Sequence, residues 1–526
     1  MINLRSVYKH SEEHTRQAVM ILFLFLTLFL FIQTIFSPSI AIATLLTTVV
    51  IFMTIFRPQF TLAGLALYLP FESLILKFTP DTIYSFARFF SEGLIYLVAA
   101  VLLYRWISGR AKFQETALDL PFILFVCSLL AAAVVHFVPP TVTILGIRQI
   151  LRFMLVFFLV VQLRPSKLFV KKLTIALFLI LMFQSGLGIA QSFVGEPLDQ
   201  FLLASDERTL GEMTLTGGVE QFWDPGSRVF ATLGRYDRLG NFLYLFLLIA
   251  SGFLFTAADH SRPLRSLLWW VFGLGIPALV LTYSRASWFA FLIGFLFIGL
   301  VIKRDKKVIA GLLVSIFLVL GYLGISGLTV GLLAEAPGQT LSERFFESFS
   351  STRWRGEYYG LGRTFWFEQT PLVVVTASPL IGWGAGQFGA GAVSALHNTT
   401  VYEQLGLPFG VFGTEGFIDN NWFSLWAEAG TIGMIFYVWM FIVLFYRALQ
   451  TYHESDDPLI KGLAIGFTAV MIAVTFNAFT STVLEIRTLA FYFWLYGGFV
   501  WVLGEKLFRS GPARSRHGSR WRALIV

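Results

Sequence analysis

Apolar residues occur along this chain in long runs that short polar segments separate. Counting runs of about 17–22 residues, the length that crosses a bilayer as a helix, gives about fourteen predicted spans. Hydrophobic residues make up 56% and charged residues 13% of the sequence, well below the roughly 25% charged residues of soluble domains. The pattern therefore predicts an all-α polytopic membrane protein. The predicted spans are 17–36, 39–56, 60–76, 89–105, 118–137, 142–162, 173–194, 239–257, 267–284, 286–302, 308–328, 429–449, 461–481 and 484–505.

Basic residues in the connections between these runs predict how the chain is oriented. If the N-terminus is cytoplasmic, the clusters at 164–172, 303–307 and 506–522 fall on one side, as the positive-inside rule requires. Both termini are then cytoplasmic, and the net charge of +8 is explained by topology rather than by nucleic-acid binding. We expect the first run to stay as a helix, because it is longer than the apolar core of a cleaved signal.

Two long polar segments lie on the opposite, outer side of the predicted topology. The first is 195–238 and the second is 329–428. A long connection in a protein of this kind is usually functional. In the second segment we predict a surface helix that opens at Thr340, and another helix from Arg363 to Ala377 that ends before Pro379. The predicted organisation is 1–328 with eleven spans, 329–428 as the large loop, 429–505 with three spans, and 506–526 as a basic tail.

The cations of the predicted outer side are almost all arginines, with Lys77 as the only lysine. Arginine presents a planar fork that matches phosphate and carboxylate groups, so this bias favours recognition of an anionic ligand. The alternative is that several of them pair with outer carboxylates such as Glu343, Glu347 and Glu357. The arginines are Arg88, Arg208, Arg228, Arg235, Arg238, Arg285, Arg344, Arg353, Arg355, Arg363 and Arg487, together with Arg148 and Arg152 in the sixth span.

Three of these arginines form our hypothesis for a pyrophosphate clamp. Arg285 lies between two spans with almost no loop, and an ionisable residue at membrane depth is costly enough to suggest a function. The alternative for Arg285 is that it extends to the outer interface. Arg363 begins the predicted loop helix, and Arg228 closes the first outer segment. Together they could hold a diphosphate at the bilayer surface.

Asp419 is the candidate general base, and Asn420 and Asn421 would orient the substrate. A helix N-cap is the competing and compatible interpretation of Asp419. Glu428 could support this site or act only as a partner of the helix dipole. The sequence leaves open whether His397 contributes.

The same segments argue against a metal or a nucleotide-type phosphate loop. We find no paired acids in a short outer loop, so we predict a metal-independent reaction without a cofactor, in which arginines stabilise the leaving group. The glycines at 382, 384 and 386 follow a predicted helix rather than a strand. We therefore interpret them as a turn that lets the backbone pack closely.

Four segments resemble the O-antigen ligase and polymerase superfamily. Ser-Arg-Ala-Ser-Trp at 284–288 is similar to its Ser-Arg-Gly segment, and 363–388 resembles its Arg-(x)-Trp and Pro-Leu-(x)-Gly-(x)-Gly-(x)-Gly-(x)-Phe segment. Residues 419–433 resemble its His/Asp-Asn segment with the following Glu-(x)-Gly-(x)-(x)-Gly, and 228–241 is faintly similar to a fourth, with Ala where Gly is usual. The resemblance covers about residues 220–440.

This resemblance implies a metal-independent, inverting glycosyltransferase of the membrane-embedded, GT-C-like type. It would use an undecaprenyl-pyrophosphate-linked glycan donor at the periplasmic or outer face of the bacterial inner membrane. Arg285 and Arg363 would bind the donor pyrophosphate, and Asp419 stands where ligases have a catalytic histidine. We predict further substrate contacts for Arg228, Arg235, Asn420, Asn421, Trp366, Arg152 and Glu428.

An aspartate at that position favours a polymerase that joins repeat units into O-antigen or exopolysaccharide. A ligase that transfers glycan to lipid A-core is the alternative. The expected acceptor is a glycan or lipid-linked glycan, and a flippase and a chain-length regulator are candidate partners. A membrane transporter is a further alternative, which the depth of Arg152 favours; transporters, however, usually carry internal repeats and polar groups at the midplane.

Overall fold

The computed structural model describes residues 27, 38–203, 207–210, 213–217, 228–256, 261–314, 344–345, 347–349, 354–355, 363–409 and 420–510. The chain divides into two compact units. One comprises residues 1–65 and 75–111, and the other comprises residues 66–74 and 112–526. All the candidate site residues of the sequence analysis lie in the second unit.

In the first unit, helices α2 (Pro38–Phe56) and α5 (Asp81–Ile107) pack against each other. The Arg105 guanidinium donates a hydrogen bond of 2.7 Å to the carbonyl of Ile55. Proline has no backbone N–H and a fixed φ, so Pro58 starts a new helix rather than continuing α2. That helix is α3 (Pro58–Tyr68), and η1 (Leu69–Phe71), which belongs to the second unit, and α4 (Glu72–Lys77) follow it along the chain.

The second unit is built from helices that the predicted apolar runs largely anticipate. Its elements before the large loop are α6 (Asp119–Val135), α7 (Pro140–Leu151), α8 (Met154–Leu163), α9 (Lys167–Val194), α10 (Glu196–Leu202), η2 (Ala231–Leu233), α11 (Tyr236–Leu254), α12 (Arg262–Leu281), α13 (Arg285–Leu296) and η4 (Phe297–Ile302). Those that follow are η6 (Glu347–Phe349), α17 (Arg363–Gln369), η7 (Thr370–Val375), α18 (Ala390–Leu396), α19 (Thr400–Gln404), α20 (Asn421–Glu454), α21 (Pro458–Asn477) and α22 (Arg487–Ser510).

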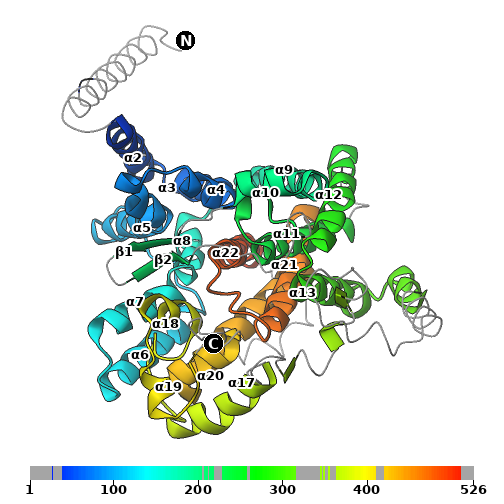
Figure 1. Ribbon diagram of the computed structural model, residues 1–526. Helices are drawn as coiled ribbons and strands as arrows, with labels where there is room; N and C mark the ends of the chain where they lie inside the picture. The colour runs from blue at the N-terminus through cyan, green and yellow to red at the C-terminus, as the bar shows by residue number, and fades with distance from the viewer. Residues whose placement is uncertain are drawn as a thin grey trace. The chain divides into compact units, whose positions relative to one another are not determined.

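Helix α22 is the core of this unit, where it packs against α8, α11, α20 and α21 (Figure 1). Nearly all its side chains from Leu489 to Leu503 are buried. Aromatic rings fill the contacts, and Tyr492 meets Phe246 of α11 at 4.9 Å between ring centroids. Such an apolar, ring-rich interior gives the unit a rigid frame that positions the polar groups at the helix ends.

The number of membrane spans was predicted as about fourteen. Among the described residues, eight helices are long and apolar enough to cross a bilayer. A ninth span arises if α7 and α8, which meet at a bend of 55°, are counted as one. The predicted span 17–36, apart from residue 27, and most of 308–328 lie outside the described residues, and 39–56 and 118–137 correspond to shorter apolar helices. The chain is thus a polytopic, largely helical membrane protein, and the figure of fourteen stays a prediction.

The predicted outer segment 195–238 contains a β-hairpin that the sequence analysis did not predict. Strands β1 (Glu207–Leu210) and β2 (Met213–Gly217) pair antiparallel, with Leu210 opposite Met213. These stretches are rich in threonine and leucine, and β-branched residues suit a strand. The all-α prediction therefore needs this one correction in the described part of the chain.

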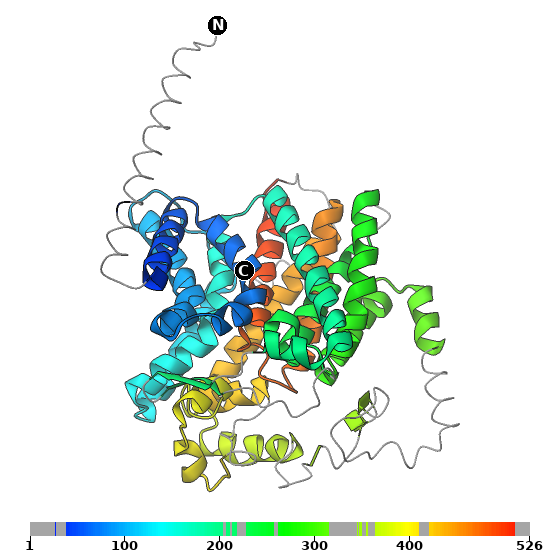
Figure 2. The ribbon, with the colours of Figure 1, turned by 45° about the horizontal axis from the view of Figure 1, so that its top comes forward.

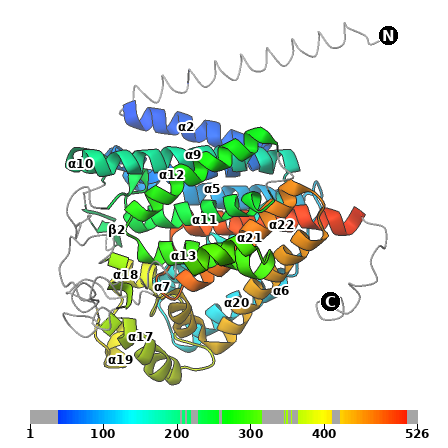
Figure 3. The same ribbon diagram turned by 90° about the vertical axis from the view of Figure 1, so that its right-hand side faces the viewer.

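The helix predicted from Arg363 to Ala377 is confirmed. It begins as α17 at Arg363, continues as η7, and ends before Pro379. The predicted helix start at Thr340 lies outside the described residues. In the same outer segment, Phe345 and Phe349 have their ring centroids 5.9 and 6.1 Å from that of Phe289 of α13. In Figures 2 and 3, α17, α18 and α19 gather near one end of α20.

Candidate functional site

Helix α20 is interrupted at Gly430, and this break is the structural centre of the site. Gly430 has φ 67° and ψ −179° inside an otherwise helical segment. A non-helical residue removes the hydrogen bonds that would cross it. The carbonyls of Ala427 and Glu428, and the amides of Thr431 and Ile432, consequently have partners outside the helix.

The segment Pro379–Gly384 supplies all four partners. The amides of Trp383 and Gly384 donate to the carbonyls of Ala427 and Glu428, each at 2.9 Å. In return the amides of Thr431 and Ile432 donate to the carbonyls of Pro379 (3.0 Å) and Leu380 (3.1 Å). The two segments that resembled family motifs in the sequence are therefore halves of one backbone interlock.

Glycine is required at this interlock for two separate reasons. Gly382, Gly384 and Gly386 have φ of 79°, 96° and 80°, a region that side chains disfavour. A Cβ on Gly382 would also lie 2.3 Å from the backbone nitrogen of Gly430. The interpretation of this stretch as a turn for close backbone packing is confirmed.

The side chain of Glu428 also holds this loop in place. Its Oε1 accepts hydrogen bonds from the amides of Gly386 (3.0 Å), Phe388 (3.1 Å) and Gly389 (2.6 Å), and the residue is 4% exposed. These contacts assign Glu428 to holding the loop, which agrees with the supporting role that the sequence suggested. A direct contact with substrate stays a prediction.

We expect Glu428→Leu to destabilise the protein by about 3 kcal/mol or more, since each orphaned buried N–H costs about 1–3 kcal/mol. Glu428→Gln keeps the accepting oxygen and should retain most of the stability. Thermal unfolding of the purified protein measures both. Glu403→Leu is the control, because that carboxylate is exposed and accepts from Thr399 on its own short helix. Equal melting temperatures for Glu428→Leu and Glu428→Gln would contradict the assignment.

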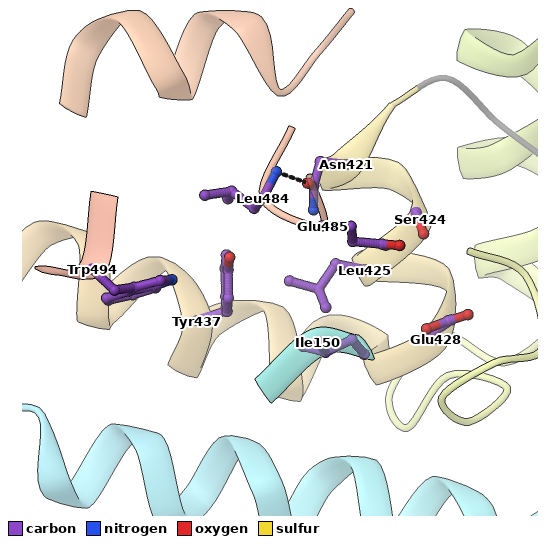
Figure 4. A pocket seen from close by; sticks show the side chains of 9 residues that line it. All are labelled: Ile150, Asn421, Ser424, Leu425, Glu428, Tyr437, Leu484, Glu485 and Trp494. Atoms are coloured by element: carbon purple, nitrogen blue, oxygen red, sulfur yellow. Dashed lines mark hydrogen bonds between the residues drawn. The ribbon is translucent and has the colours of Figure 1, made fainter. Parts of the chain in front are cut away.

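A second carboxylate, Glu485, lies close to the first across a small cavity (Figure 4). The cavity has a volume of about 10 Å³, close to the minimum for one water molecule. Asn421, Ser424 and Glu428 line it from α20, and Glu485 lines it from the loop after α21. Glu485 Oε2 accepts from Gln149 Nε2 (3.1 Å) and from the amide of Gly391 (3.0 Å). Glu485 thereby joins α7, α18 and the loop between α21 and α22.

Burial raises the pKa of the Glu485 carboxyl above its ordinary value of 4.5, although its hydrogen bonds and the charge of Arg152 oppose the shift. Well below pH 4.5 the Glu485 carboxyl is protonated in both the folded and the unfolded chain. As the pH rises, the unfolded chain ionises first, so the free energy of unfolding falls until the pH passes the folded-state pKa. We therefore expect Glu485→Gln to lose less stability than the wild type as the pH rises above 4.5. Melting curves at increasing pH test it, and parallel pH profiles would contradict it.

One buried polar network connects the start of α13, where Arg285 lies, with Arg363. Arg285 is the first residue of α13, and three residues separate it from the end of α12. Its neighbour Ser284 bonds Ser287 (2.9 Å between hydroxyl oxygens), and Ser287 donates to Asn241 Oδ1 of α11 (3.4 Å). From α21, Asn477 Nδ2 also donates to Asn241 Oδ1, at 3.0 Å.

The network continues from Asn477 to Arg363. Thr480 Oγ1 donates to Asn477 Oδ1 at 3.1 Å, and the carbonyl of Thr480 accepts from the Arg363 guanidinium at 3.2 Å. The guanidinium also lies 5.8 Å from the centroid of the Trp354 ring. A short series of hydrogen bonds thus connects the α13 terminus, which carries Arg285, with Arg363.

The asparagines predicted to orient substrate have structural partners. Asn420 is the N-cap of α20, and its side chain accepts from the amide of Phe423 at 3.0 Å. Asn421 Oδ1 accepts from the amide of Leu484 at 2.9 Å. Asp419 lies outside the described residues. The capping role that the sequence offered for Asp419 belongs to Asn420.

The other predicted contacts are spread over the second unit. Trp366 is buried in an apolar cluster with Phe388 and Tyr402, which gives it a packing role. Arg152 is buried and donates to the carbonyl of Glu485 at 3.3 Å. His397 is exposed and ends α18.

Two arginines of the first outer segment have local contacts instead. The Arg228 guanidinium lies 4.8 Å from the centroid of the Tyr236 ring, and the exposed Arg235 pairs with Asp237 at 3.1 Å. Arg487 similarly pairs with Glu72 at 2.6 Å. The alternative of local pairing therefore holds for Arg235 and Arg487. Substrate contacts of Arg228 and Arg235 stay predictions.

Sequence reasoning did not single out Asn477, Thr480 or Glu485. A signal existed for the first, because an asparagine inside an apolar run of a membrane protein indicates a polar partner. Asn241, which Asn477 contacts, and Arg363, which Thr480 contacts, are far away in the sequence, so only the fold reveals these contacts.

Comparison with known proteins shows which family part of this chain matches. Residues 270–438 match the family model described as O-Antigen ligase. This segment belongs to the O-antigen ligase family. It contains Arg285, Arg363, Asp419 and the interlock at Gly430, whereas the faint resemblance at 228–241 lies outside the match. No curated protein matches the chain.

The match of residues 270–438 supports a membrane protein with a glycan function of the O-antigen ligase or polymerase type. For the family's segment in this chain, the structure supplies the physical basis of the motifs. The glycines and Glu428 build the interlock, and Arg363 donates to the carbonyl of Thr480 in the loop after α21. Within the described residues no group of three or more His, Cys, Asp or Glu could hold a metal ion.

Proposed function

We propose that this protein is a membrane glycosyltransferase that polymerises lipid-linked oligosaccharide repeat units. The donor is an undecaprenyl-pyrophosphate-linked glycan, and the acceptor is another lipid-linked glycan. The reaction takes place at the outer face of the bacterial inner membrane, with both termini of the chain in the cytoplasm. It yields O-antigen or exopolysaccharide.

The observation that supports a lipid-linked donor is an apolar groove that lies close to Arg363. The groove has a volume of about 870 Å³ and runs along α20 and α21, where Trp422, Phe423, Trp426, Ile435, Ile442 and Phe479 line it. The indole N–H groups of Trp422 and Trp426 donate to Thr475 and Thr431, so both have partners within the protein. Such a lining suits a hydrocarbon chain.

The groove and the Arg363 guanidinium both reach the start of the loop that follows α21. Phe479 lines the groove, and the carbonyl of the next residue, Thr480, accepts from Arg363. Phe423 also lines the groove, and its ring lies 5.5 Å from Phe367 of α17. A lipid whose tail occupies the groove would therefore present its pyrophosphate to Arg363. Arg285 would add a second cation at the N-terminus of α13, where the helix dipole also favours an anion.

The chemistry assigned to the site is an inverting displacement at the sugar carbon that bears the pyrophosphate. Asp419 accepts the proton of the attacking hydroxyl, the new glycosidic bond forms as the bond to the pyrophosphate breaks, and the arginines take up the charge of the leaving group. An aspartate rather than a histidine at this position supports a polymerase over a ligase that acts on lipid A-core. A flippase that delivers the donor and a regulator of chain length are the partners we propose.

The purified protein, supplied with a lipid-linked repeat unit, tests the proposal. We expect a ladder of products that persists in EDTA and is strongly reduced in Asp419→Asn. Transfer to lipid A-core without a ladder would favour the ligase. Movement of the intact donor across vesicles, with no new glycosidic bond, would favour a transporter and overturn the proposal.

A further inference from the structure

The buried polar network described above has a central residue that neither the sequence motifs nor the family segment includes. Asn477 is the last residue of α21, is 1% exposed, and lies beyond residue 438, where the family match ends. Its amide group donates to Asn241 and to the hydroxyl oxygen of Tyr244 (3.4 Å), and its Oδ1 accepts from Thr480. One side chain therefore ties α21 to α11 and to the loop that receives Arg363.

The network also extends to α13, the helix that begins with Arg285. Asn241 Oδ1 accepts from Ser287 as well, and Ser287 stands two residues after Arg285 in α13. A Cβ on Gly240 would lie 2.5 Å from the Ser287 hydroxyl. Glycine at 240 thus lets α11 approach α13 closely enough for this contact.

We propose that Asn477 is a positioning residue that fixes Arg363 and the Arg285-bearing end of α13 relative to each other. This inference rests on the proposed function, because the two guanidinium groups must present their hydrogen bonds to one diphosphate. Two long, flexible side chains on separate elements gain little unless the backbones that carry them are held in register. Buried, fully paired amide networks supply such registration in apolar surroundings.

Substitutions at 477 and 480 separate this role from general stability. Thr480→Val removes the hydroxyl link to Asn477 but keeps the carbonyl that accepts from Arg363, and Thr480→Ser restores the hydroxyl. Thr468→Val is the matched control, because Thr468 is buried on α21 and its hydroxyl donates to the Ala464 carbonyl of its own helix. We expect Asn477→Leu and Thr480→Val to lower kcat by about 10- to 100-fold. Thr480→Ser and Thr468→Val should stay close to the wild type.

A double-mutant cycle shows whether the effect passes through Arg363. In an Arg363→Lys background, Asn477→Leu should cost only about 1- to 3-fold, because the geometry that it supports is already lost. A residue with a purely structural role would cost the same factor in both backgrounds. Equal factors would overturn the inference, while loss of activity in Arg363→Lys alone would leave the proposed function standing.

A distance measurement completes the test without depending on transfer activity. Cys127 is the only cysteine of the chain, so a Cys127→Ser background accepts spin labels at Leu292 of α13 and Glu368 of α17, after substitution of each by cysteine. We expect a narrow distance distribution in this background and in Thr468→Val, and a broad one in Thr480→Val and Asn477→Leu. Unchanged distributions would overturn the inference. If Asn477→Leu fails to fold, the distance distribution of Thr480→Val still tests the inference.

Discussion

Replacing Arg363 with alanine is expected to lower the rate of glycan transfer by roughly 10²- to 10³-fold, the effect of removing one preorganised donor to a developing charge. Arg285→Ala should behave similarly. Arg363→Lys should also lose most activity, because an ammonium group cannot donate two parallel hydrogen bonds to a phosphate. Product ladders from the purified variants with a lipid-linked repeat unit measure all three.

Arg355→Ala is the matched control for these variants. Arg355 is also a predicted outer arginine, but its side chain is exposed and it is not among the predicted substrate contacts. Exposed charges contribute little, and we expect a change of less than about 3-fold. Full activity of Arg285→Lys or Arg363→Lys would show that charge alone suffices, and the hypothesis of a bidentate clamp would then be wrong.

Gly382→Ala is expected to separate the loop from helix α20. The new Cβ would meet the Gly430 nitrogen at 2.3 Å and the Glu428 carbonyl oxygen at 2.6 Å, and neither backbone atom can move without breaking the interlock. The positive φ adds about 1–2 kcal/mol of its own. Destabilisation beyond 4 kcal/mol, an exceptional value for a point mutation, is therefore expected, with loss of transfer. Thermal unfolding and the ladder assay measure the two effects.

Gly406→Ala isolates the contribution of φ. Gly406 has φ 65°, but a Cβ there meets no atom within 4 Å. This variant should cost only about 1–2 kcal/mol and keep its activity. If Gly382→Ala cost no more than Gly406→Ala, the close backbone contact would not be essential to the fold.

The sequence by itself determined the class of protein and the position of its main helices. Apolar runs long enough to span a bilayer leave few alternatives to helices, because the bilayer interior offers no partner for an unpaired backbone group. The same physics located the tight connection before Arg285 and the helix that begins at Arg363, and the glycines at 382–386 indicated close packing. The β-hairpin at 207–217 was missed, because short amphipathic strands in a polar segment leave a weak pattern.

The tertiary structure alone showed which protein groups the motif residues contact. Glu428 holds the loop at 386–389, Asn420 caps the start of α20, and Asn421 binds the loop at Leu484. Their contacts with substrate stay predictions. Asn477 was not recognised as a site residue, because its partner Asn241 lies 236 positions away on α11, and Arg363, which contacts the neighbouring Thr480, is also distant in the sequence. Local patterns encode which segments form helices. Hydrogen bonds between distant segments depend on how those helices meet, and only the fold provides that information.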